Sequence, residues 1–390
     1  MTAKLTRRQW LAASLCLPSA LAAGPRDWNR PAPLGKSGLK VTPLGLGCGV
    51  LDANVYQKAV DAGINYFHCL PYGQETFLEL VGKAVKPVRS RVVLACGGNQ
   101  GNKKDLLEQV EKRLKNLGTD YIDLFYLTSK HKPEAITDEL MEALRAAKQA
   151  GKIRAGALST HGLAAIVPRL LEVREVVGAI MIVCNFATWV QAADPNVPPR
   201  ASLPGGGWED ITKVRKAGIG IVAMKALVGG LQFAPPDRQA WAKSLEGPSR
   251  QAALAAALKW VLRNEQVDTA PVAVDDAQQF ERNLKTAAEP FTDADKQRLA
   301  AAVERISPYY CRMCQRCEGA CRSGLPVSDV MRFLMYAEGY GNIERGRREF
   351  QRLPQELRAV RCGDCPGCTV RCPNGVRVRE RLSRAQTVLA

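Results

Sequence analysis

Short apolar runs alternate with amphipathic segments through most of the chain. Eight runs have the length and composition of buried β-strands, at 44–49, 66–70, 92–97, 121–128, 153–159, 179–185, 220–225 and 269–274. Apolar residues recur at helical spacing between them, at 55–62, 75–84, 104–117, 133–150, 162–173, 209–217 and 250–263, and then at 277–287 and 293–305. Continuous apolar strands that alternate with helices predict a parallel sheet covered by helices.

Eight such units over about 260 residues have the size of a (β/α)8 TIM barrel, an α/β fold. An open doubly wound sheet is the alternative, but no G-x-G-x-x-G sequence follows the first predicted strand. A short hairpin is expected around 39–43, and long loops at 186–208 and 231–249 are expected to cover one end of the barrel. Functional residues of a barrel stand at the C-terminal ends of its strands, so the residues after each strand are the candidates.

Two cysteine runs near the C-terminus carry the strongest chemical signal. Each has the C-x₂-C-x₂-C-x₃-C spacing of bacterial [4Fe–4S] proteins, in which the fourth cysteine binds the other cluster. The predicted ligands of one cluster are Cys311, Cys314, Cys317 and Cys372, and those of the other are Cys362, Cys365, Cys368 and Cys321. With helices expected at 327–337 and 342–353, residues 306–390 are predicted to form a small helical, ferredoxin-like iron–sulfur domain after the barrel at 34–305.

Two other interpretations of these cysteines stay open. Cys₄ sets also bind tetrahedral zinc, although zinc sites are usually built from two separated C-x-x-C pairs. A disulfide framework is less favoured, because cysteines so close together have few partners at the right separation. Arg322 stands where proline follows the fourth cysteine in this pattern, a position that shapes a turn and binds no iron.

The chain is strongly basic, with 55 Lys and Arg against 38 Asp and Glu, and arginine is abundant beside the second cysteine run. Thiolate-ligated clusters are negatively charged, so this arginine is expected to offset their charge and to attract an acidic redox partner. No nucleic-acid fold signature accompanies the charge, so nucleic acid is not expected as a partner. A redox protein or a quinone-linked donor is expected instead, together with a small-molecule substrate.

The N-terminus has the pattern of an export signal. Residues 6–11 read TRRQWL and precede a short apolar run and a small-residue site at 20–22. Paired arginines are typical of the twin-arginine route, which exports folded proteins. Residues 1–23 are therefore predicted to be a signal peptide, and the mature chain is placed in the bacterial periplasm. An uncleaved membrane anchor is the alternative; Cys16 follows a leucine too large for a lipoprotein site.

Several stretches within 34–305 resemble aldo/keto reductases. They are LGKSGLKV at 34–41, LGLG at 44–47, AGINYF at 62–67, DYIDL at 120–124, GKIR at 151–154 and GIGIVAMK at 218–225. Together with the two cysteine runs, they make the chain similar to the exported members that carry a two-cluster tail. The resemblance implies a barrel in which hydride passes from a nicotinamide cofactor to a carbonyl, with a catalytic tetrad of Asp, Tyr, Lys and His.

The sequence departs from that tetrad. Residues 67–73 read FHCLPYG, so Tyr72 is kept while His68 stands where the family has Asp. Cys96 and Gly97 replace the Thr-Lys pair after the third strand, and the lysine that would lower the pKa of the tyrosine is absent. Thr128 takes the histidine position, with His131 three residues further on. The resemblance makes Tyr72 and His68 the catalytic candidates.

Only some of the family's cofactor-binding residues are present as well. Ser159 and Asn185 match the family's cofactor-binding residues, but Met181 replaces its glutamine. Residues 273–276 read AVDD where the family has glycine and a basic residue, and two carboxylates there would repel a 2′-phosphate. NADP(H) is therefore a doubtful cofactor.

Four further cysteines follow predicted strands, namely Cys48, Cys69, Cys96 and Cys184. With His68 they are candidates for a metal or redox site. The alternative, which we favour, is that they are small buried apolar residues.

Three functions follow. The favoured one is an exported iron–sulfur oxidoreductase. The alternatives are an electron-transfer or binding protein with an inactive barrel, and an NADPH-dependent carbonyl reductase.

Overall fold

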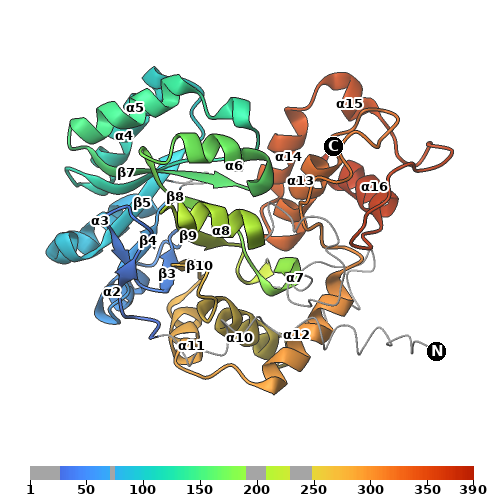
Figure 1. Ribbon diagram of the computed structural model, residues 1–390. Coiled ribbons are helices and arrows are strands. Elements are labelled where there is room, and N and C mark those ends of the chain that lie inside the picture. Colours follow the sequence, from blue (N-terminus) through green and yellow to red (C-terminus); the bar gives the residue numbers. More distant parts are fainter. Residues whose placement is uncertain (1–26, 71–74, 190–207, 229–247) are drawn as a thin grey trace.

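The computed structural model describes residues 27–70, 75–189, 208–228 and 248–390 (Figure 1). Eight parallel strands pair in the order β10-β3-β4-β5-β6-β7-β8-β9. They are β3 (Leu44–Gly47), β4 (Tyr66–His68), β5 (Val93–Gly98), β6 (Ile122–Leu127), β7 (Ile153–Thr160), β8 (Val177–Val183), β9 (Gly220–Met224) and β10 (Ala270–Ala273). A parallel bridge between Val222 and Thr269 joins β9 to the start of β10 and closes the ring. The predicted (β/α)8 barrel is confirmed.

Helices surround the strands at nearly the predicted positions. They are α2 (Ala53–Asp61), α3 (Phe77–Val85), α4 (Lys103–Leu117), α5 (Asp138–Gln149), α6 (Leu163–Glu172), α8 (Trp208–Lys216), α10 (Pro248–Leu262), α11 (Ala277–Ala287) and α12 (Asp293–Ile306). Short segments add η2 (Lys86–Arg91), η3 (Pro133–Ala135) and α7 (Phe186–Trp189). Polar caps set several starts; at α12, Thr292 and Asp295 form a reciprocal capping box.

Alternation along each strand separates two apolar layers. In β4, Tyr66 and His68 point into the barrel, whereas Phe67 and Cys69 lie in the layer between strands and helices. The barrel interior is filled by Tyr66, Tyr126, Leu124, Met181 and Val222, and the two tyrosine hydroxyls are 3.0 Å apart. The interior is therefore a packed core below the mouth, and not a channel.

A short hairpin closes the N-terminal end of the barrel. It pairs β1 (Ala32–Pro33) with β2 (Lys40–Val41), so the predicted hairpin is present but begins earlier in the chain. Its turn packs against the start of β9, where the Lys36 amide donates to the Gly218 carbonyl at 2.6 Å. Gly35 has φ of +51°, and a Cβ there would lie 2.4 Å from the Gly218 oxygen. Only glycine fits this close approach.

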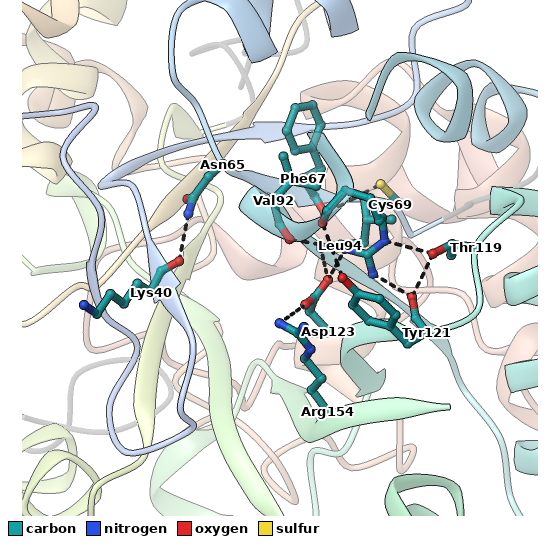
Figure 2. Close-up of polar contacts among 11 residues, drawn as sticks. Lys40, Asn65, Phe67, Cys69, Val92, Leu94, Thr119, Tyr121, Asp123 and Arg154 are labelled. Carbon is teal, nitrogen blue, oxygen red and sulfur yellow. Dashed lines mark hydrogen bonds and ion pairs between the residues drawn. The ribbon is translucent and has the colours of Figure 1, made fainter. Parts of the chain in front are cut away.

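A buried carboxylate braces three strands near their N-terminal ends (Figure 2). Asp123 of β6 accepts the amide of Leu94 in β5 at 3.0 Å and pairs with Arg89 at 2.8 Å and with Arg154 of β7 at 3.1 Å. The ring of Tyr121 lies under both guanidinium groups, at 3.8 and 4.5 Å. Burial raises the pKa of Asp123, and the two arginines oppose that effect. This network lies away from the mouth and is structural.

The tail forms a helical unit on one side of the barrel, orange to red in Figure 1. It contains α13 (Val327–Gly339), α14 (Ile343–Gln351), α15 (Gln355–Ala359) and α16 (Val378–Leu389) around its own apolar core, which includes Leu334, Phe350 and Leu382. Glu338 of α13 pairs with Arg381 at 2.7 Å and Arg384 at 2.8 Å, which joins α13 to α16. The two predicted tail helices are confirmed, and α15 and α16 are additional.

Within the described residues, every helix is too short or too polar to cross a membrane. The predicted export signal at 1–23 lies outside the described residues, as do most of the two long loops predicted after β8 and β9.

Candidate functional site at the barrel mouth

A cavity of about 320 Å³ opens where the strands end. The barrel contributes residues that follow several strands, and the tail contributes Tyr336, Tyr340, Asn342 and Arg345. The tail therefore forms one wall of the cavity. This is the end of a (β/α)8 barrel at which catalytic and binding residues gather.

His68 lines the cavity from the end of β4. Its ring is stacked with that of Tyr66 at 6.3 Å and meets the edge of Tyr126 at 5.3 Å. Burial lowers its pKa to about 3, so the imidazole is neutral at physiological pH. Its Nδ1 has no hydrogen-bond partner in the described part of the chain. A neutral imidazole with a free ring nitrogen can exchange a hydrogen bond or a proton with a bound molecule.

Two further imidazoles, of His131 and His161, form a pair at the cavity. His161 follows β7 and lines the cavity, and its Nδ1 lies 3.4 Å from Nε2 of His131. Burial lowers the pKa of both rings, to about 4 for His131, and the positive charge of Lys225 lowers both further. Sequence reasoning noted His131 but missed His161, which comes two residues after the candidate Ser159 and could have been found from that spacing.

The two predicted cofactor residues have different positions. Ser159 lines the cavity, and its hydroxyl accepts the Ser129 amide at 3.3 Å. Asn185 is fully buried and is not among the lining residues. Its amide nitrogen donates to the Lys225 carbonyl at 3.0 Å and to the Tyr310 hydroxyl at 3.1 Å, and its oxygen accepts the Thr188 amide at 3.0 Å. The described residues thus fit a nicotinamide cofactor poorly, because the expected carboxamide partner is occupied within the protein.

The other catalytic candidate, Tyr72, lies outside the described residues. Of the pair proposed from sequence, the structure therefore places His68 alone.

The mouth cysteines divide into two kinds. Cys69, Cys96 and Cys184 are fully buried in the layer between strands and helices, and burial raises the pKa of each thiol. Cys48 is half-buried at the cavity wall, with its sulfur 3.3 Å from that of Cys69. Among the described residues, no three His, Cys, Asp or Glu side chains lie close enough together to hold a metal ion. The burial of Cys69, Cys96 and Cys184 in an apolar layer favours the interpretation of these three as small apolar residues.

The two C-terminal cysteine runs lie side by side. Thr369, next to Cys368, donates to the carbonyl of Ala320, next to Cys321, at 2.6 Å. Asn374, two residues after Cys372, donates to the Cys314 sulfur at 3.5 Å. Each run thus places its fourth cysteine at the other run.

The thiols that shift the pKa of Cys311 and of Cys362 belong to the same two sets of cysteines. Burial raises the pKa of Cys311, and the thiols of Cys317, Cys314 and Cys372 raise it further. Burial likewise raises the pKa of Cys362 to about 11, with contributions from Cys321, Cys368 and Cys365. These two sets are the ones predicted from the spacing. Thiolates of a cubane each bind a different iron, so they stand further apart than four ligands of one ion.

The first set adjoins the barrel. Cys311 packs both against the barrel's apolar layer, to which Tyr310 and Met313 belong, and against the core of the tail, whereas Cys362 belongs to the tail core alone. The side chain of Gln315 lies against Gly162, directly after His161, where an added Cβ would be 3.1 Å from its oxygen. The first cysteine loop therefore contacts the rim of the mouth.

The barrel, with its site at the strand ends, has the architecture of an aldo/keto reductase. The model of the Aldo/keto reductase family matches residues 51–304, and the chain belongs to this family. It is 32% identical over 158 residues to the uncharacterized oxidoreductase YqkF of Bacillus subtilis, covering 36% of this chain and 50% of that protein. It is 30% identical over 154 residues to the aldo-keto reductase YhdN of the same organism, covering 33% and 46%.

The chain thus spans about half the length of these curated relatives. Among solved structures, the holo form of aldo-keto reductase AKR11C1 from Bacillus halodurans superposes with a TM-score of 0.52 at 24% identity, covering 70% of this chain and 96% of that one. At that identity the likeness concerns the fold.

Proposed function

We propose that this protein is an exported iron–sulfur oxidoreductase, in which a helical tail with two [4Fe–4S] clusters serves an aldo/keto reductase barrel. The observation that carries the proposal is the exchange of fourth cysteines between the two runs. Spacing alone predicts the sets 311/314/317/372 and 362/365/368/321, and the contacts of Thr369 and Asn374 bring the same residues together.

The donor sets fit such clusters. Thiolates are the usual ligands, and when bound the clusters supply one-electron transfer. Arg379 donates to the carbonyls of Cys362 at 3.2 Å, Gly363 at 3.0 Å and Cys365 at 3.1 Å, which fixes the second cysteine loop and places positive charge beside it. Arg371 donates to the Cys368 carbonyl at 2.6 Å. A cationic side chain at each of these places would offset the charge of the thiolates.

At the barrel mouth, the protein's own residues would bind the substrate and handle its proton. His68 is neutral, and its Nδ1 has no partner among the described residues, so it would form a hydrogen bond with the substrate beside the reacting atoms. Tyr72 is the proton donor proposed from the family resemblance. The tail wall would exclude water from this step.

The export proposal rests on the twin arginines at positions 7 and 8. It suits cofactors that are inserted before translocation, and it makes a periplasmic redox protein or a quinone-linked donor the expected partner.

Two alternatives differ in what the barrel does. An electron-transfer protein with an inactive barrel would need neither His68 nor Tyr72. An NADPH-dependent carbonyl reductase would need a nicotinamide site, against which the occupied amide of Asn185 and the carboxylates at 275 and 276 argue.

The test is anaerobic reduction of the purified protein, followed by a screen of electron acceptors for reoxidation. We expect turnover with a small-molecule acceptor to fall by about 100-fold or more in Tyr72→Phe, as is usual for loss of a general acid. Turnover should also fall in His68→Ala, because the substrate loses a hydrogen bond. Turnover unchanged in both variants would favour the inactive barrel. NADPH oxidation as fast as cluster reoxidation would favour the carbonyl reductase.

A further inference from the structure

Lys225 occupies an unusual place at the cavity wall. It follows β9 directly and has φ of +59°, a left-handed conformation that residues other than glycine seldom adopt. Two hydrogen bonds to the Lys225 carbonyl hold this conformation. The carbonyl accepts the side-chain amide of Asn185 at 3.0 Å and the backbone amide of Val228 at 2.9 Å. Backbone strain that the surroundings maintain collects at functional sites.

The side chain of Lys225 points at the tail. Its Nζ lies 4.8 Å from the ring centroid of Tyr340 and 5.4 Å from that of Tyr336. The guanidinium of Arg345 is 4.0 Å from the same Tyr336 ring. All four residues line the cavity, so two cations from different domains meet around one aromatic ring.

Among the described residues, Lys225 forms no ion pair with a carboxylate, and the carboxylate of Asp329 pairs with Arg332 at 2.6 Å. Burial lowers the pKa of Lys225 to about 7, and the charges of Arg345 and Arg332 contribute. Lys225 remains half-buried because its side chain faces the cavity. A lysine in such surroundings gains from a negative partner.

The remainder of the cavity is mainly apolar. Its other walls include Leu70, Met181, Met224 and Ala273, and its polar groups come from Thr128, Ser129, Ser159, Asn342 and the histidines His68 and His161. Its volume of about 320 Å³ is at the small end for ligand pockets. It therefore suits a small molecule with one charged end and a compact apolar body.

We propose that this cavity binds a small organic anion, whose carboxylate lies between Lys225 of the barrel and Arg345 of the tail and whose apolar body rests on Met181 and Met224. The identification of this anion as the substrate rests on the proposed function; the binding site itself does not. Because one cation comes from each domain, the tail completes the anion site.

The experiment uses the full-length, cluster-loaded protein, with benzoate as the anionic probe and benzamide as its neutral counterpart of nearly equal shape. Isothermal titration should give benzoate an affinity about 10- to 100-fold higher than that of benzamide, as expected for a charge-assisted contact. Lys225→Met and Arg345→Gln should each remove most of that preference, and Lys225→Arg should retain it. Lys58→Met, which removes an exposed surface lysine paired with Glu281, should leave it unchanged. Circular dichroism and iron content check the fold of each variant.

Equal affinity for the two probes, or an undiminished preference in Lys225→Met, would overturn the proposal. So would displacement of benzoate by NADPH together with loss of NADPH affinity in Lys225→Met, because the anion would then be a cofactor phosphate. The anion preference does not depend on iron. If the protein binds iron but does not prefer benzoate over benzamide, the anion site is wrong and the proposed function stands. If it prefers benzoate but binds no iron, the anion site stands and the proposed function is wrong.

Discussion

The side-chain amide of Asn185 donates a hydrogen bond of 3.1 Å to the hydroxyl of Tyr310. Asn185 follows strand β8 of the barrel, and Tyr310 immediately precedes the first cysteine of the tail. Both side chains are buried. A residue that the family resemblance assigns to cofactor binding thus anchors the link between barrel and tail, and the same amide fixes the backbone of Lys225 at the cavity.

This bond predicts a specific loss of stability. Tyr310→Phe leaves one buried N–H of Asn185 without its partner, which should lower the free energy of unfolding by about 1–3 kcal/mol. Tyr309→Phe is the matched control, because Tyr309 is half-buried and its hydroxyl lies 3.4 Å from the exposed Arg377. Anaerobic urea denaturation measures both variants. Equal midpoints would show that the Asn185 contact contributes little.

The histidines predict destabilisation by acid. Burial holds the pKa of His68 at about 3, against about 6.5 in an unfolded chain, so the unfolded state binds more protons below pH 6.5. The contribution of His68 is fully present above pH 6.5 and is lost as the pH falls toward 3. It should amount to about 2 kcal/mol between pH 7 and 5. His68→Gln should reduce the fall in unfolding free energy over that interval, and an identical pH dependence would contradict the buried neutral ring.

The exchanged ligands predict an asymmetry between double variants. Cys314→Ser with Cys372→Ser removes two ligands from one predicted cluster, so about half the iron should remain. Cys314→Ser with Cys321→Ser removes one ligand from each predicted cluster and should affect both. If each run held its own cluster, the order of iron contents, measured after anaerobic reconstitution, would be reversed.

The barrel could be predicted because its signal is local. Buried parallel strands are continuously apolar, as in 179–183, and glycine or polar caps mark the helix ends, as Gly118 does after α4. Helix α16 was missed because three arginines in its first two turns obscure the helical spacing of four apolar residues that face the tail core, namely Val378, Leu382, Ala385 and Leu389. The pairing of the cysteines into two ligand sets stays a prediction from their spacing, which the contacts of Thr369 and Asn374 support.

The composition of the site could not be predicted from sequence. His68 was correctly placed at the mouth, but the wall formed by Tyr336 and Arg345 depends on how two domains dock, and no local pattern encodes that. Asn185 matched a family position while its contacts changed, because Tyr310 reaches it from 125 residues away. Lys225 was not predicted to be a site residue, because it stands in the stretch 218–225, which resembles the family.

The content of iron and acid-labile sulfide in the anaerobically purified full-length protein distinguishes two [4Fe–4S] clusters from two zinc sites in the tail. We predict about eight iron and about eight sulfide per chain, with the absorption and reduced-state paramagnetic resonance of [4Fe–4S] clusters. About two zinc per chain with no sulfide would contradict the proposed iron–sulfur clusters, because the eight cysteines would then form structural zinc sites.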